Sequence, residues 1–170
     1  MQERQEEKVE SVDDWFAEYG RISLPMYDWL WFKAQGKAES LLDPNAVSPA
    51  GAQGIMQIMP RTWKDIEEEL GIFASPFNAK VNIRFGVHYM RKMVNFWKAP
   101  RTDEERLKLA QASYNAGPGN VLAAQRLCNG ASLWDQIAWC LSNVTGGKNS
   151  HETITYVERI ARYYDGFTSP

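Results

Sequence analysis

Apolar residues recur at helical spacing along most of the chain, and prolines and glycines divide this pattern into separate segments. Pro25 can open a first helix that Pro44 stops, and Pro60 can open a second that Gly71 ends. Thr102 and Glu105 have the spacing of a capping box. These signals predict helices over residues 26–42, 61–70, 75–97, 102–113, 119–127, 132–141 and 152–164.

Two glycine-containing segments interrupt the helical pattern. Asn45–Met59 (NAVSPAGAQGIMQIM) reads as turns and a short hairpin, and it follows directly after the predicted helix end that carries Glu39. Tyr114–Asn120 (YNAGPGN) is predicted to be irregular as well. Gly51 and Gly54 are expected to give the backbone room, by left-handed angles or by close approach of a ligand. Such breaks are favourable places for a ligand to reach the backbone.

The length of 170 residues suits one domain. Met1–Asp14 carries six acids and two bases, and we predict that it is a mobile acidic tail before a single domain over 15–170. Four aromatic residues near this end are expected to pack an N-terminal helix onto the domain: Trp15, Tyr19, Trp29 and Trp31.

Composition and charge exclude several classes of protein. The chain is 44% hydrophobic and 24% charged, which is ordinary for a globular protein and excludes disorder. Its net charge is −2, of which the first fourteen residues contribute −4, so the remaining chain carries only +2. This balance argues against a dedicated nucleic-acid binder. No stretch is apolar enough for a membrane span, and the polar first ten residues do not resemble a secretory signal.

Most kinds of catalytic site lack the residues that they need. A metal site needs three or four ligands, whereas the chain has two histidines far apart, so we expect no metal. Cys128 and Cys140 can equally be a disulfide or two free thiols. No serine lies in a nucleophile elbow, and no glycine-rich turn follows a strand of a βαβ unit. Carboxylate chemistry remains.

Glu39 is the candidate acid because its neighbours, from Ala38 to Leu42, are neutral. A carboxyl group in an apolar cleft has a raised pKa and can donate a proton near neutral pH. The alternative is a solvated glutamate at a helix end. Asp43 lies four residues on, and a retaining glycosidase places a second carboxyl group about 5 Å away. Because Asp43 precedes Pro44, opening a turn is its favoured role.

Four blocks of sequence resemble the lytic transglycosylases of glycoside hydrolase family 23, of the soluble lytic transglycosylase type. They are Ala38-Glu39-Ser40, SPAGAQGIMQIMPRTW (Ser48–Trp63), ASYNAGPGNV (Ala112–Val121) and ETITYV (Glu152–Val157), and they occur in the family's order. The run between the third and fourth blocks resembles variants found in bacteriophage genomes.

The resemblance implies an α+β, mainly helical, lysozyme-like fold with a small β-sheet beside the cleft. It implies cleavage of the β-1,4 bond between N-acetylmuramic acid and N-acetylglucosamine in peptidoglycan, with no cofactor. The family's essential glutamate falls on Glu39. Residues that match the family's cleft positions are Ser48, Met56, Gln57, Tyr114, Asn115, Glu152 and Tyr156, of which the last lies near the catalytic acid.

Several of these residues also have a structural interpretation. Met56 and Tyr114 can pack against sugar faces or fill the core, Asn115 can bind an acetamido group or cap a turn, and Glu152 can be an ordinary first-turn acid. One carboxyl group that acts first as acid and then as base fits a chain with no evident second partner.

The favoured function is therefore a lytic transglycosylase, phage-encoded and used in host lysis or local wall opening. We expect a monomer that is made in the cytoplasm and acts on periplasmic peptidoglycan after release or as part of a virion. Two alternatives are a muramidase that hydrolyses the same bond with water, and a non-catalytic wall-binding or virion structural domain.

Overall fold

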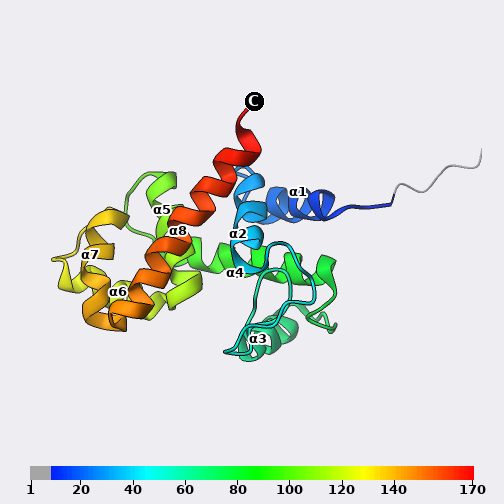
Figure 1. Ribbon diagram of the computed structural model, residues 1–170, viewed down its shortest axis with the longest axis horizontal. Coiled ribbons are helices and arrows are strands. Elements are labelled where there is room, and N and C mark those ends of the chain that lie inside the picture. Colours follow the sequence, from blue (N-terminus) through cyan, green and yellow to red (C-terminus); the bar gives the residue numbers. More distant parts are fainter. Residues whose placement is uncertain (1–8) are drawn as a thin grey trace, which may run out of the picture.

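The computed structural model describes residues 9–170 and is mainly helical, as predicted. Its helices are α1 (Val12–Ser23), α2 (Leu30–Ser40), α3 (Pro60–Leu70), α4 (Ala79–Phe96), α5 (Asp103–Ala116), α6 (Pro118–Leu127), α7 (Trp134–Thr145) and α8 (Gly147–Thr168). Figure 1 shows α8 crossing the front of the molecule, with α5 to α7 on one side of it and α1 and α3 on the other.

Several predicted helix ends are confirmed by their capping geometry. Pro60 is the first residue of α3, and Gly71 ends that helix in the left-handed conformation at φ +65°. The Thr102 side chain accepts a hydrogen bond from the Glu105 backbone N–H at the start of α5. The Glu105 carboxylate, however, accepts from the Trp134 backbone N–H at 2.6 Å, and so ties the start of α7 to α5.

The N-terminal helix begins within the segment that was expected to be a tail. A capping box between Ser11 and Asp14 starts α1, so the expected boundary after residue 14 falls inside a helix. Glu10 also contacts the domain, because its carboxylate accepts hydrogen bonds from Lys80 at 2.6 Å and from the Trp15 indole. The first eight residues of the predicted tail lie outside the described part of the chain.

The predicted break at Tyr114–Asn120 is almost entirely helical. Helix α5 continues through Ala116 and α6 begins at Pro118, with only Gly117, at φ +86°, between them. The left-handed region that glycine enters readily allows the chain to change direction within one residue. Tyr114 and Asn115 therefore sit on the last turn of a helix, which fixes their side chains more firmly than a loop would.

The buried side chains form two clusters. One lies among α1, α3, α4 and the segment 41–59, together with Leu107 and Ala110 of α5, and the other lies among α5, α6, α7 and α8. Helix α2 belongs to both, because Phe32 packs into the first cluster whereas Ala34 and Ala38 pack into the second. The carboxyl end of α2, which carries Glu39, therefore lies where the two halves of the molecule meet.

The expected β-sheet beside the cleft does not form in the described residues. Segment 41–59 contains only two isolated antiparallel bridges, between Val47 and Gln53 and between Gln53 and Ile58. Left-handed residues at both ends of the segment, including Leu42 and Gln57, turn the backbone too often for extended strands. A short set of turns takes the place of the sheet.

Asn82 of α4 holds this segment in place. Its buried amide donates hydrogen bonds to the carbonyls of Gln53 and Pro76 and accepts one from the Met56 backbone N–H at 2.7 Å. Both the NH₂ group and the carbonyl oxygen of Asn82 thus hold a segment that has no regular structure.

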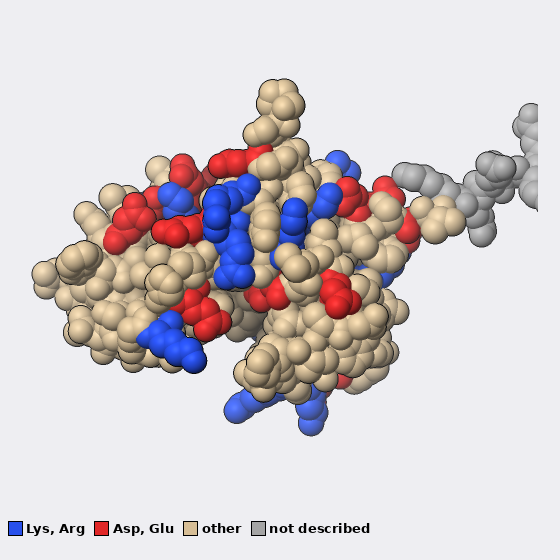
Figure 2. Space-filling view, in the orientation of Figure 1, with Lys and Arg blue, Asp and Glu red and all other residues tan. Residues whose placement is uncertain are grey.

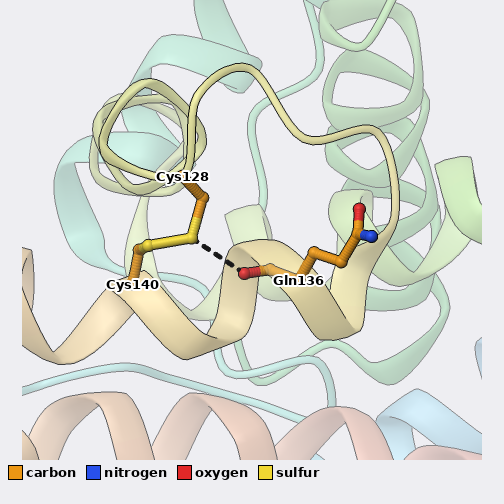
Figure 3. The surroundings of a disulfide bond; sticks show 3 residues. All are labelled: Cys128, Gln136 and Cys140. Carbon is orange, nitrogen blue, oxygen red and sulfur yellow. Dashed lines mark hydrogen bonds between the residues drawn. A yellow bond between two sulfur atoms is a disulfide. The ribbon is translucent and has the colours of Figure 1, made fainter.

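A disulfide joins Cys128, at the end of α6, to Cys140 in α7, with their Cα atoms 5.9 Å apart (Figure 3). The structure thereby decides between the two states that the sequence left open. Among residues 9–170, no helix is both long and apolar enough to cross a membrane.

Candidate active site

Glu39 lies in the last turn of α2, at the point where the helix stops. Leu41 adopts the left-handed conformation and ends the helix, so the chain turns away and leaves the Glu39 side chain at the edge of a cleft. Tyr156 of α8 donates a hydrogen bond from its hydroxyl to Glu39 Oε1 at 2.6 Å. The two residues are 117 positions apart in the sequence.

Burial raises the pKa of Glu39 to about 8, because the surrounding protein removes water from the charged carboxylate. The hydrogen bond from Tyr156 and the positive charge of Arg159 lower this pKa, and the nearby negative charge of Glu152 raises it. The loss of hydration outweighs the other effects. Glu39 is therefore mostly protonated at pH 7 and can serve as a general acid.

A polar cleft of about 260 Å³ surrounds this carboxyl group. It is lined by Ala38, Glu39, Ser48, Ala52, Gln57, Asn115, Glu152, Tyr156 and Arg159. Figure 2 shows the hollow between the half that contains α6 to α8 and the half that contains segment 41–59 and α3, with acidic side chains at its edge. The structure thus brings together Glu39 and five of the other predicted site residues, from both halves of the molecule.

Two of these residues have hydrogen-bonding groups left for a ligand. The Oδ1 atom of Asn115 accepts a hydrogen bond from Thr153 at 2.7 Å, which fixes the amide and leaves its NH₂ group as the donor. Ser48 accepts a hydrogen bond from the Ala52 backbone N–H, so its own hydroxyl proton remains available to donate.

Two predicted substrate contacts have a structural role instead. Met56 is fully buried and touches no part of the cleft, because its side chain packs over Gly86 of α4. Tyr114 does not line the cleft either: its hydroxyl donates to the Met56 carbonyl at 2.7 Å, and so joins α5 to segment 41–59. Neither side chain lines the cleft in this structure, and their contact with sugar stays a prediction.

Gln57 lines the cleft, but its side chain is partly committed to the loop. Its Nε2 atom donates to the carbonyls of Ala46 and Gly54, and its own backbone has φ +49°. Only the Oε1 atom remains for a ligand. Asp43, in contrast, has the turn role that was favoured for it, because its carboxylate accepts from the Asn45 backbone N–H.

Arg159 is the site residue that the sequence did not reveal. It lies three residues after Tyr156, on the same side of α8, and its guanidinium reaches the Ala38 carbonyl at 3.4 Å. The signal that could have pointed to Arg159 is its position three residues after Tyr156, because this spacing places two residues on the same side of a helix. Within residues 9–170, no three potential metal ligands are grouped to hold an ion.

Comparison with known families gives one match over most of the chain. Residues 26–136 match the family model described as the transglycosylase SLT domain. Among curated proteins, membrane-bound lytic murein transglycosylase F of Shewanella oneidensis is 32% identical over 152 residues, and that of Marinobacter nauticus is 35% identical over 153. These alignments cover 81% of this chain but only 31% and 29% of the relatives, so the chain spans about a third of their length.

Solved structures share the fold. The 70-kDa soluble lytic transglycosylase of Escherichia coli superimposes with a TM-score of 0.68 at 26% identity, covering 92% of this chain and 24% of that one. An inactive variant of lytic transglycosylase Slt from Pseudomonas aeruginosa gives a TM-score of 0.69 at 25% identity, covering 89% and 23%.

Proposed function

The chain belongs to the transglycosylase SLT family, and on that basis we propose that it is a peptidoglycan lytic transglycosylase. It cleaves the β-1,4 bond between N-acetylmuramic acid and N-acetylglucosamine. The observation that supports this proposal most strongly is Glu39, a carboxyl group at the edge of a polar cleft whose pKa is raised to about 8. A binding module has no need of a protonated acid at that point.

In the proposed reaction, the protonated Glu39 gives its proton to the glycosidic oxygen as the bond from that oxygen to C1 breaks. The carbonyl oxygen of the muramic acid's own acetamido group closes on C1 and stabilises the developing positive charge. The Glu39 carboxylate then takes the proton from the C6 hydroxyl, whose oxygen displaces the acetamido oxygen and closes a 1,6-anhydro ring. No water is consumed, and Glu39 ends protonated again.

The remaining cleft residues position the reacting groups. The Asn115 NH₂ group donates to an acetamido or ring substituent, and the Ser48 hydroxyl donates to a second one. The Tyr156 hydroxyl steadies the carboxylate that forms when Glu39 loses its proton. Gln57 and Glu152 border the same space and contact the sugar or its substituents.

The setting of the reaction is part of the same proposal. The enzyme acts as a monomer on periplasmic peptidoglycan, and it is phage-encoded and serves host lysis or local opening of the wall. The disulfide between Cys128 and Cys140 supports action outside the cytoplasm, because such bonds persist in oxidising compartments.

Glu152 supports a second candidate, the muramidase. Its negative charge is close enough to raise the pKa of Glu39, so the cleft holds a second carboxylate that a hydrolase can use as a general base.

A pair of matched substitutions tests the proposal on purified sacculi. Glu39→Gln keeps the size of the side chain but removes its proton, and we expect release of fragments to fall by roughly 100- to 10,000-fold. Glu152→Gln removes only the second carboxylate, and we expect it to stay within about tenfold of the unsubstituted enzyme. An active Glu39→Gln protein would refute Glu39 as the acid. A loss in Glu152→Gln as severe as that in Glu39→Gln would favour the muramidase.

A further inference from the structure

A second pocket lies beside α8, outside the cleft that contains Glu39. It has a volume of about 350 Å³ and is enclosed by α5, α8 and the start of α2. Val157, Ala161 and Tyr164 of α8 line it, whereas Tyr156 of the same helix points to Glu39. The pocket and the catalytic cleft have no lining residue in common.

Gln111 of α5 places an unpaired amide in this pocket. The residue is 2% exposed, and among the described residues its side chain has no hydrogen-bond partner. Asn82 and Thr153, two other buried polar side chains, are satisfied by hydrogen bonds. Because this amide opens onto the pocket, a ligand that supplies both a donor and an acceptor can pair with it there.

The walls of the pocket are aromatic and already held in position. Trp31 and Tyr164 stack with their ring centroids 3.8 Å apart, and the Tyr164 hydroxyl donates to Asp28 at 3.1 Å. The Tyr27 hydroxyl donates to the Asp103 carbonyl at 2.9 Å. These contacts fix the rings before any ligand arrives, which lowers the entropic cost of binding.

The rim of the pocket is rich in carboxylates. Asp28, Asp103 and Glu104 border it, and Lys108, the one basic residue among the described residues that line it, is paired with Glu104 at 2.9 Å. Carboxylates accept hydrogen bonds from hydroxyl groups. The pocket therefore combines an amide at its base, apolar and aromatic walls, and acceptors at its mouth.

We infer that this pocket is a second saccharide site, which takes one N-acetylated amino sugar of a glycan strand. The sugar's acetamido group offers one N–H and one carbonyl, which match the acceptor and donor of the Gln111 amide. Its methyl group fits against Leu107 and Val157, and the ring hydroxyls face the carboxylates at the rim.

The inference rests on the proposed function only in taking the cell wall as the source of the sugar. A strand held here would keep the protein on insoluble peptidoglycan while the cleft works on another part of the polymer. Binding to sacculi should therefore depend on the pocket, whereas cleavage of short soluble fragments should not.

The test is a titration of Glu39→Gln protein with N,N′,N″-triacetylchitotriose, followed by two-dimensional NMR. Side-chain resonances of Gln111 and Trp31 report on the pocket, and those of Asn115 report on the cleft. We expect both groups to shift with increasing trisaccharide. Shifts at Asn115 with none at Gln111 and Trp31 would overturn the inference, whereas shifts at the pocket alone would support it and count against the proposed function.

Three further substitutions, one of them a control, locate the binding. Ala161→Phe fills the pocket from α8 and should abolish the Trp31 shift while the Asn115 shift remains, which also shows that the protein is folded. Gly166→Phe, on the same helix with no atom near an added Cβ, is the matched control and should keep both shifts. Gln111→Leu should weaken binding at the pocket by roughly five- to tenfold. Unchanged pocket affinity in Gln111→Leu, or an unchanged Trp31 shift in Ala161→Phe, would refute the site.

Discussion

Glu39 shows how the properties of one residue depend on distant parts of the chain. Its neutral neighbours predicted a raised pKa, and the structure gives the direct cause: loss of hydration outweighs the Tyr156 hydrogen bond and the Arg159 charge. Neither of those residues is near Glu39 in the sequence. The neutral residues around Glu39 could therefore suggest a general acid, but they could not show which groups lower its raised pKa.

This balance of effects predicts the pH dependence of the reaction. Since Glu39 must be protonated to act as the acid, the rate should fall as the pH rises through about 8. The Tyr156 hydrogen bond favours the charged form and lowers the pKa, so Tyr156→Phe should move this fall to a higher pH. The measurement is the rate of fragment release from sacculi between pH 5 and about pH 10.

Tyr114→Phe is the control for this experiment. Its hydroxyl bonds to the Met56 carbonyl rather than to Glu39, so the pH at which the rate falls should stay in place even if the maximal rate drops. A Tyr156→Phe enzyme whose rate fell at an unchanged or lower pH would show that Tyr156 does not set the protonation of Glu39.

The other site residues were predictable to different degrees. Ser48, Asn115, Glu152 and Tyr156 meet at the cleft, as the family resemblance implied. Met56 does not, because a sequence pattern cannot distinguish a methionine that faces a cleft from one that packs against a glycine behind it. The hydrogen bond from Thr153 that orients Asn115 could not be predicted from the sequence either, because it joins α8 to α5.

At the scale of elements, segment 41–59 depends on close packing at Gly54. Its φ of +79° confirms the predicted left-handed angle, and an added Cβ would overlap the Asn82 amide and the Pro76 carbonyl. Gly51 has a similar angle, φ +93°, but no atom of residues 9–170 lies within 4 Å of its added Cβ. Substitutions at these two glycines can therefore separate the effect of backbone strain from the effect of steric overlap.

We expect Gly51→Ala to lower the free energy of unfolding by about 1–2 kcal/mol through its backbone angle alone. Gly54→Ala should cost a further 1–3 kcal/mol or so, because it also displaces Asn82. It should reduce activity too, since Asn82 holds the segment that carries Ser48 and Gln57. Chemical denaturation measures both variants, and equal losses of stability would mean that the segment tolerates the displacement.

The disulfide gives a second prediction at this scale. It closes a short loop between α6 and α7, and in the chain-entropy model such a loop contributes about 3 kcal/mol. Replacing both Cys128 and Cys140 by Ser should lower the free energy of unfolding by about that amount, and the reduced protein should match the double variant. Thiol titration of unreduced, denatured protein should find no free thiol, and two free thiols would contradict the bond.

Helices were more predictable than the segments between them. Pro60 and Gly71 set the ends of α3 by local chemistry, and the sequence contained both signals. The pattern at 114–120 misled because two glycines and a proline suggested a loop, although Gly117 alone makes the turn. The β-sheet was expected from the resemblance, and the left-handed residues of segment 41–59 prevent it.

At the scale of the whole molecule, the two buried clusters place the cleft. Helix α2 packs into both, so its end brings Glu39 to the junction, where α8 supplies Tyr156 and Arg159. Periodicity in the sequence indicated which helix faces are buried but not which helices pair. Which helices pair could be inferred only from the family resemblance, which rests on the order of the four sequence blocks.

The central claim is that the reaction ends by closing a ring rather than by adding water. The most direct measurement is mass spectrometry of the fragments that the purified protein releases from sacculi. Our account predicts muramoyl ends that are lighter by one water than hydrolysis products, and their loss in Glu39→Gln. Reducing muramoyl ends from the active protein would contradict the account and identify a hydrolase on the same fold.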